Sequence, residues 1–222
     1  MIENFTIDFA TQGLENIQNI LDEYGVCVIK NYFDNETCDV WFNQLKTFLI
    51  NLNIGLTDDV KTWKLTNMPL GPRYGMYQSI ITHAPTFFEI RKRVKPIFER
   101  LWNTEDLICS LDGATIYPYK KDKNLSWAHI DQTVLGKKCY QSQVVLTDTS
   151  ASFMCTPGSH KNHDDLMKVI KPTTKNWYKF KKDEVDLSNH IPIYTSKGSV
   201  ILWDSRTVHS AKNHTALDTK NT

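Results

Sequence analysis

The stretch His129-Ile-Asp131 places two metal-ligand residues one residue apart in a strand-like segment, and Gly198-Ser-Val-Ile-Leu-Trp-Asp-Ser-Arg-Thr-Val-His209 supplies a second histidine. Side chains two positions apart in a strand point to the same face, so His129 and Asp131 can bind one ion together. Two imidazoles and a carboxylate on one side of an octahedral ion leave the opposite positions open, which suits non-haem Fe(II) oxygen chemistry. The pattern indicates an enzyme.

From Leu107 onward the chain reads as short strands separated by turns, with one helical insertion at 161–170. We expect strands at 107–117, 126–131, 141–148, 152–156, 191–194, 199–203 and 205–210. Because few helices separate these segments, the pattern favours a mostly β fold with flanking helices, built on a jelly-roll or double-stranded β-helix core, over a parallel sheet. Such a core can bring the two ligand-bearing strands together at one mouth.

The first half of the chain, residues 1–106, reads as helix-rich with one early strand at 24–30. We expect helices at Leu14 to Tyr24, from an N-cap at Asp34 or Asn35, and at Pro85 to Trp102, where Pro96 predicts a kink or a break. The irregular stretch 55–83 predicts a mobile or functional loop. Residues 1–222 then form a single domain, with the jelly-roll core at 107–222.

Composition excludes several classes of function. The 222 residues are 41% hydrophobic and carry a formal net charge of +1, so no global field favours nucleic acid or an anionic membrane. The five cysteines are odd in number and form no CxxC pair, which favours reduced thiols in the cytosol or nucleus. Without a secretion signal or an apolar run long enough to span a membrane, we expect a protein that is not secreted. The oligomeric state stays open.

Other polar and aromatic residues near the ligands have ordinary structural explanations. Ser159, in the turn Pro157-Gly-Ser-His160, is placed to cap the helix that follows, and His160 is not assigned to the metal. Surface or structural roles are expected for His83, His163, His190 and His214. Trp127 and Trp203 are expected to pack on the opposite faces of their strands, and Asp204 with Arg206 to form an ion pair or a loop anchor.

Four motifs carry a family resemblance. In order and spacing, His129-Ile-Asp-Gln132, Gln143-Val-Val-Leu-Thr-Asp148, Pro157-Gly-Ser-His-Lys161 and the stretch ending at His209 resemble the phytanoyl-CoA dioxygenase-like branch of the Fe(II)/2-oxoglutarate-dependent oxygenases. The similarity covers roughly residues 107 to 210. The motifs together are specific to this superfamily, but they identify no substrate.

The resemblance implies a site and a reaction. His129, Asp131 and His209 would hold Fe(II), with 2-oxoglutarate and molecular oxygen at the remaining positions, and a small or medium organic substrate would be hydroxylated with release of succinate and CO2. Because the carboxylate Asp131 is present, whereas related halogenases lack it, hydroxylation or a related oxidation is expected. Gln132 and Gln143 are candidate groups for orienting a ligand or the co-substrate.

One part of the family pattern is missing. In the family a basic residue, usually Arg, follows the distal histidine on the last core strand and pairs with the far carboxylate of 2-oxoglutarate. Here no Arg follows Arg206, and the polar tail 213–222 predicts that the last strand is absent. Lys220 falls at a suitable spacing and can bind a carboxylate as a point charge. The alternatives are a shortened chain, a lysine from another strand such as Lys120 or Lys121, or loss of 2-oxoglutarate use.

The sequence is also compatible with two functions other than that of an oxygenase. One is a catalytically silent jelly-roll protein that binds a ligand or partner without the 2-oxoglutarate anchor. The other is a cupin-type enzyme, in which a divalent ion polarises the substrate without 2-oxoglutarate. Substrate contacts are sought in the 55–83 loop, which commonly covers the mouth of such a barrel, although packing onto the body explains its aromatic residues equally well. The residues considered are Trp63, Arg73, Tyr74, Tyr77 and Gln78.

Overall fold

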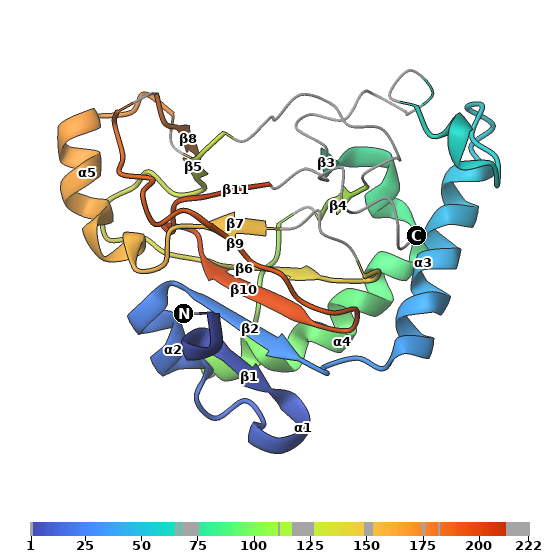
Figure 1. The fold of residues 1–222 in the computed structure, drawn as a ribbon, viewed down its shortest axis with the longest axis horizontal. Coiled ribbons are helices and arrows are strands. Elements are labelled where there is room, and N and C mark those ends of the chain that lie inside the picture. The colour runs from blue at the N-terminus through green and yellow to red at the C-terminus, as the bar shows by residue number, and fades with distance from the viewer. Residues whose placement is uncertain are drawn as a thin grey trace.

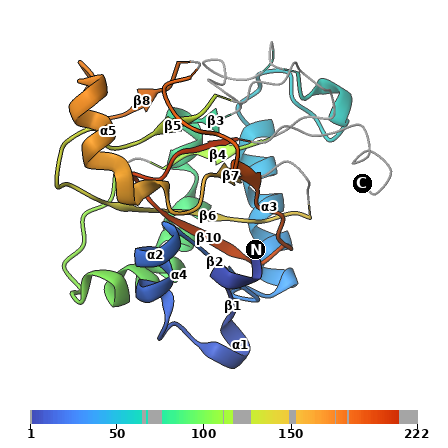
Figure 2. The same cartoon turned by 60° about the vertical axis from the view of Figure 1, so that its left-hand side comes forward.

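Two sheets packed face to face form the centre of the fold. The computed structural model describes residues 2–64, 67, 76–110, 112–116, 127–148, 153–174, 176–181 and 183–211. One sheet lies above the other in Figure 1, and the turned view of Figure 2 keeps this order. The rings of Phe153 in the upper sheet and Trp203 in the lower sheet have centroids 4.6 Å apart. The inner faces of the two sheets therefore touch.

The sheets combine strands that are distant in sequence. The lower sheet has the order β1-β2-β10-β6, made of β1 (Thr6–Asp8), β2 (Val26–Lys30), β10 (Val200–Asp204) and β6 (Tyr140–Val144). The upper sheet has the order β8-β5-β11-β7-β9, made of β8 (Tyr178–Lys179), β5 (His129–Ile130), β11 (His209–Ala211), β7 (Phe153–Cys155) and β9 (Ile191–Pro192). A separate pair joins β3 (Met76–Tyr77) to β4 (Ala114–Thr115). All ladders are antiparallel except that of β1 with β2.

Helices flank the two sheets. The α-helices are α1 (Phe9–Gln12), α2 (Ile17–Tyr24), α3 (Asn35–Ile50), α4 (Pro85–Trp102) and α5 (His163–Ile170). Short 3-10 helices are η1 (Ile2–Phe5), η2 (Val60–Thr62), η4 (Ser79–His83) and η5 (Ser159–Asn162). Among the described residues, no helix is both long and apolar enough to cross a membrane.

Local sequence signals place the helix ends. The backbone N–H of Thr37 donates to the side chain of Asp34 at 2.7 Å, which confirms the expected N-cap of α3. Gly25 ends α2 in the left-handed conformation at φ 69°, and its N–H donates to the carbonyl of Leu21. The predicted start of this helix at Leu14 was wrong, because the α-helix begins at Ile17.

The helix α4 runs through Pro96 without a break. Proline removes one hydrogen bond from the helix interior, but it does not have to end a helix whose neighbouring turns are held by other contacts. Val94, Ile97 and Leu101 lie on both sides of Pro96, and all three are buried in the core cluster shared with the lower sheet. Their packing keeps the two halves of α4 in one continuous helix.

The expectation of a mostly β protein is not confirmed, because more of the described residues lie in helices than in strands. The predicted strand at 107–117 is represented only by β4, and parts of that segment lie outside the described residues. The predicted strand at 205–210 begins only at His209, since a turn in which Thr207 N–H donates to the Asp204 carbonyl precedes it. The predicted helical insertion is confirmed as α5 with the preceding η5.

The turn before β10 requires a glycine. Gly198 has φ 83°, and a Cβ at this position would lie 2.1 Å from the backbone oxygen of Phe33. The carbonyl of Gly198 also accepts a hydrogen bond from Phe33 N–H at 2.9 Å. This close approach starts the strand that leads to His209, and it explains why a glycine occupies this turn.

Replacing Gly198 should therefore destabilise the protein by more than the strain of a positive φ alone. Gly198→Ala is expected to lower the free energy of unfolding by about 3 kcal/mol, because the strained φ and the clash with Phe33 both act. Gly136→Ala is the matched control: Gly136 also has positive φ, but no described residue beyond its chain neighbours lies within 4 Å of its Cβ position, so about 1 kcal/mol is expected. Urea denaturation measures both, and equal losses would contradict the role assigned to the Phe33 contact.

Candidate metal centre

The three predicted ligand residues converge at one point of the upper sheet. His129 lies in β5, Asp131 follows that strand directly, and His209 opens β11. The two strands pair with His129 opposite His209. Nε2 of His129 lies 3.7 Å from Oδ1 of Asp131, and Nε2 of His209 lies 3.4 Å from Oδ2. Candidate ligand atoms of all three residues lie within 4.8 Å of one another, which is close enough to surround one ion.

Backbone carbonyls orient both imidazoles. Nδ1 of His209 lies 2.8 Å from the carbonyl of Thr207, and Nδ1 of His129 lies 3.3 Å from the carbonyl of Trp127. A carbonyl only accepts, so Nδ1 carries the proton in each ring and donates to the residue two positions earlier. In the neutral form of each ring, Nε2 therefore carries the lone pair that a metal requires.

The electrostatics of the site also favour the ligand forms. Burial, together with the charge of His209, lowers the pKa of His129 to about 3. For Asp131, burial raises the pKa, but the hydrogen bond and charge of His209 and the charge of His129 outweigh it, so the pKa falls to about 2. At neutral pH, His129 is therefore neutral and Asp131 ionised, as metal binding needs.

A glutamine from the facing sheet contacts the carboxylate. Nε2 of Gln141 in β6 donates to Oδ2 of Asp131 at 3.0 Å. The two glutamines named from the sequence do not make this contact: Oε1 of Gln132 accepts from Val134 N–H, and Gln143 lies two positions further along β6 on the same face as Gln141. The sequence named a glutamine on the same face of β6, but it did not show which of the two contacts Asp131.

Aromatic rings surround the two imidazoles. The Trp127 ring stacks on His129 at 3.9 Å between centroids, and the rings of Phe153 and Trp203 lie 5.3 and 5.6 Å from that of His209. The expectation that Trp127 and Trp203 pack on the opposite faces of their strands was wrong. Trp127 lies two residues before His129, so the same alternation that joins His129 to Asp131 places it beside the ligands.

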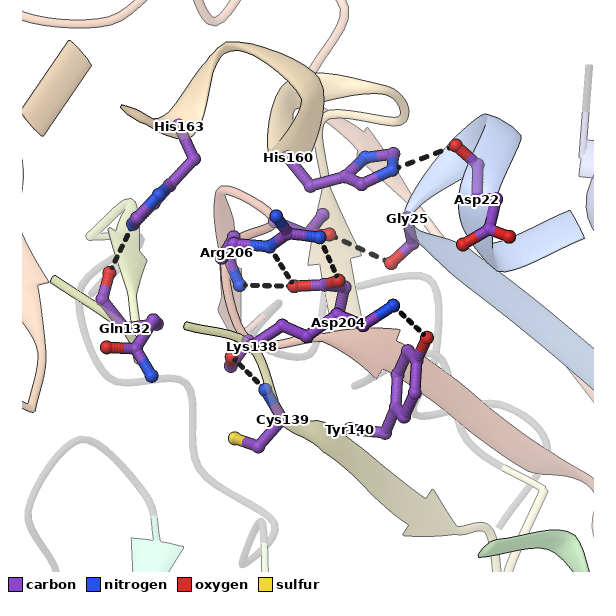
Figure 3. A network of polar contacts seen from close by, with 12 residues as sticks. Asp22, Gly25, Gln132, Lys138, Cys139, Tyr140, His160, His163, Asp204 and Arg206 are labelled. Carbon is purple, nitrogen blue, oxygen red and sulfur yellow. Dashed lines mark hydrogen bonds and ion pairs between the residues drawn. The ribbon is translucent and has the colours of Figure 1, made fainter. Parts of the chain in front are cut away.

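A tight turn joins β10 to β11, the strand that His209 opens. Arg206 and Asp204 form the expected ion pair, with Nε to Oδ1 at 2.9 Å and Nη2 to Oδ2 at 2.7 Å (Figure 3). Within the same turn, the Ser205 carbonyl accepts from Asp131 N–H, and the Thr207 hydroxyl donates to the carbonyl of Gly25. The turn therefore fixes Asp131 and the approach to His209 at the same time.

Three other histidines have structural roles, as expected. Nε2 of His160 contacts the carbonyl of Asp22, and Nε2 of His163 contacts the carbonyl of Gln132 (Figure 3). His190 lies between the hydroxyls of Thr156 and Ser210. His83 is exposed at the end of η4, and His214 lies outside the described residues.

Ser159 does not cap a helix. Its Oγ accepts a hydrogen bond from the backbone N–H of Val208 at 2.9 Å, so it supports the segment that leads into His209. The N-cap residue of α5 is Asn162, which makes no side-chain capping bond. The predicted cap was wrong because a backbone donor from a distant segment occupies the hydroxyl.

The described loop residues that were considered for substrate contact mainly pack onto the body. Trp63 and Tyr77 belong to a cluster with residues of α3 and α4, and the indole Nε1 of Trp63 donates to the Thr57 carbonyl. Burial raises the pKa of the Tyr77 hydroxyl to about 12. Gln78 is exposed. The remaining candidates lie outside the described residues: Arg73, Tyr74, Lys120, Lys121 and Lys220.

Comparisons with known proteins identify the family of the chain. The model of the family described as phytanoyl-CoA dioxygenase matches residues 21–221. "Ava biosynthesis cluster protein O" from Aspergillus versicolor is 26% identical over 234 residues, covering 93% of this chain and 75% of the relative.

Solved structures show a related fold at low sequence identity. The epimerase SnoN, in complex with Fe3+, alpha ketoglutarate and nogalamycin RO, has a TM-score of 0.61 at 14% identity, covering 91% of this chain and 78% of SnoN. EctD from S. alaskensis with bound Fe has a TM-score of 0.57 at 15% identity, covering 87% of this chain and 69% of EctD.

The buried His190 should make the apoprotein sensitive to acid. Burial, together with the charge of His209, lowers the pKa of His190 to about 4, whereas an unfolded histidine titrates near about 6.5. Between these values the unfolded chain binds a proton that the folded state does not, so the free energy of unfolding falls as the pH falls through this window. In His190→Gln, the free energy of unfolding should fall less steeply with falling pH, by up to about 1.4 kcal/mol per pH unit.

Urea denaturation between about pH 7 and pH 4 measures this slope. His83→Gln is the control, because it makes the same substitution at an exposed histidine and should leave the slope unchanged. A slope in His190→Gln equal to that of the unsubstituted protein would contradict the prediction.

Proposed function

The chain belongs to the phytanoyl-CoA dioxygenase family, and from this premise we propose that it is a non-haem Fe(II)- and 2-oxoglutarate-dependent oxygenase of a small or medium organic substrate. The observation that carries the proposal is the convergence of His129, Asp131 and His209 on one point. Two nitrogen donors and one carboxylate form the ligand set that non-haem Fe(II) oxygenases use, with open positions for reactants.

The residues present fit a divalent ion. Backbone acceptors fix the proton of each imidazole on Nδ1, and the lowered pKa of Asp131 keeps its carboxylate ionised. When bound, the iron with 2-oxoglutarate and oxygen would supply the oxidising power, releasing succinate and CO2. These features favour a working metal enzyme over a silent binding protein with the same core.

The protein's own contribution is orientation and exclusion of water. Trp127, Phe153 and Trp203 border the imidazoles, so the ligands lie in an apolar surrounding on the inner faces of the two sheets. Low polarity around the site strengthens each charge interaction within it and limits side reactions with water. We place this site between the two halves of a double-stranded β-helix core.

The co-substrate contacts remain proposals. Gln143 lies on the face of β6 that also carries Gln141, and a half-buried amide there can donate to a carboxylate oxygen. Gln132 is the weaker choice, because its Oε1 already accepts from Val134 N–H. We propose Lys220 as the partner of the far carboxylate of 2-oxoglutarate, and the support is its spacing from His209 in the sequence.

Hydroxylation is the proposed outcome of the reaction. The support is the presence of Asp131, since a carboxylate ligand leaves no position for halide. SnoN is described as an epimerase, so proteins of similar fold differ in what they make from their substrates. We therefore propose the reaction class and assign no particular substrate.

Succinate release tests the proposal. Purified protein supplied with Fe(II), 2-oxoglutarate and ascorbate is expected to form succinate slowly alone and faster with a substrate. Asp131→Ala should reduce this release at least about 100-fold, because it removes a metal ligand rather than an outer partner of one. Succinate is quantified by mass spectrometry.

Asp165→Ala is the control, since this carboxylate is exposed on α5 and pairs with Lys168 at the surface. It should retain full release and the same melting temperature. A metal-loaded, folded protein that makes no succinate, with or without candidate substrates, would refute the proposed function.

A further inference from the structure

Gln141 links the two sheets at the candidate metal centre. Its strand β6 belongs to the lower sheet, whereas Asp131 follows a strand of the upper sheet. The register of β6 and β10 places Gln141 opposite Trp203, whose ring lies on the inner face beside His209. The contact from Gln141 Nε2 to Asp131 Oδ2, at 3.0 Å, therefore crosses the interior between the sheets.

The chemistry of Asp131 decides which end of the amide faces it. The carboxylate is ionised and accepts hydrogen bonds only, so the NH2 group of Gln141 must point toward it. The other end, Oε1, is buried and has no hydrogen-bond partner among the described residues. Since no other described residue pairs with the amide, Asp131 is the contact that orients it.

This arrangement differs from that of a glutamine that stabilises the fold. A buried amide with a structural role normally satisfies both of its ends, because an unpaired polar atom costs about 1–3 kcal/mol. Within the described part of the chain, Gln141 leaves Oε1 unpaired and directs its NH2 group to the carboxylate that faces both histidines. Side chains that hold metal ligands in this way raise the affinity of a site by preorganising it.

We infer that Gln141 is a positioning residue: it fixes the carboxylate of Asp131 in the orientation in which the site binds its metal. The inference rests on the proposed function, because it takes Asp131 as a ligand. It assigns to Gln141 a role that the sequence suggested for Gln132 and Gln143. Nothing in it requires Gln141 to touch the substrate.

Metal titration tests the inference directly. Apoprotein is titrated with Mn(II), and the concentration of unbound Mn(II) is measured by electron paramagnetic resonance. Gln141→Leu is expected to bind Mn(II) about 10- to 100-fold more weakly than the unsubstituted protein. Gln141→Met keeps the length of the side chain and removes both polar atoms, so it should show the same loss of affinity. It serves as the test variant if Gln141→Leu fails to fold.

Gln143→Leu is the matched control for metal affinity. It makes the same substitution on the same strand and the same face, two positions away. It should bind Mn(II) within about twofold of the unsubstituted protein, even if it changes the affinity for 2-oxoglutarate. Melting temperatures by circular dichroism identify any variant whose loss comes from unfolding.

A spectroscopic signature separates positioning from packing. The visible absorption of bound Co(II) depends on the number and geometry of its ligands, so the Co(II) spectrum of Gln141→Met should differ from that of the unsubstituted protein at full occupancy. The spectrum of Gln143→Leu should not. A glutamine that only fills space would be replaced by methionine without a change in either spectrum or affinity.

The outcomes distinguish the inference from the proposed function. If Asp131→Ala weakens Mn(II) binding but both folded Gln141 variants bind as tightly as the unsubstituted protein, the inference is wrong and the metal site stands. If Asp131→Ala binds Mn(II) as tightly as the unsubstituted protein, the ligand assignment itself is wrong, and both fail.

Discussion

The pairing of β5 with β11 is the constraint on which the candidate site depends. These strands begin 80 positions apart, and their antiparallel register places His129 directly opposite His209. The same register leaves Asp131, just beyond the end of β5, with Oδ2 3.4 Å from Nε2 of His209. A shift of this pairing by one residue would turn one histidine to the opposite face, since side chains alternate along a strand. The site therefore depends on a single strand register.

Both short-range and long-range contacts stabilise that register. The Asp204–Arg206 ion pair closes the turn between β10 and β11 on itself. Gly25, far away in the sequence, ties this turn to the end of α2, because its carbonyl accepts from the Thr207 hydroxyl and the Asp204 N–H. A Cβ on Gly25 would lie 2.5 Å from the Thr207 hydroxyl and from Nδ1 of His160. The approach to His209 is therefore held by a residue of the N-terminal part.

Sequence patterns predicted those features that depend on neighbouring residues. The two-residue period joined His129 to Asp131, and the N-cap signal placed the start of α3. The same period also placed Trp127 beside His129, although packing on the opposite face had been expected. Tryptophan is usually buried in a core, but this preference does not determine which face of a strand it occupies.

What the sequence could not predict depends on register between distant strands. Both Gln141 and Gln143 lie on the inner face of β6, and only the ladder with β10 and the packing of the two sheets decide which one reaches Asp131. The hydroxyl of Ser159 likewise had two possible uses, and the arrival of Val208 N–H from a distant segment decided between them. Positioning groups around a metal site are therefore less visible in a sequence than its ligands, because the ligands share local motifs and their partners do not.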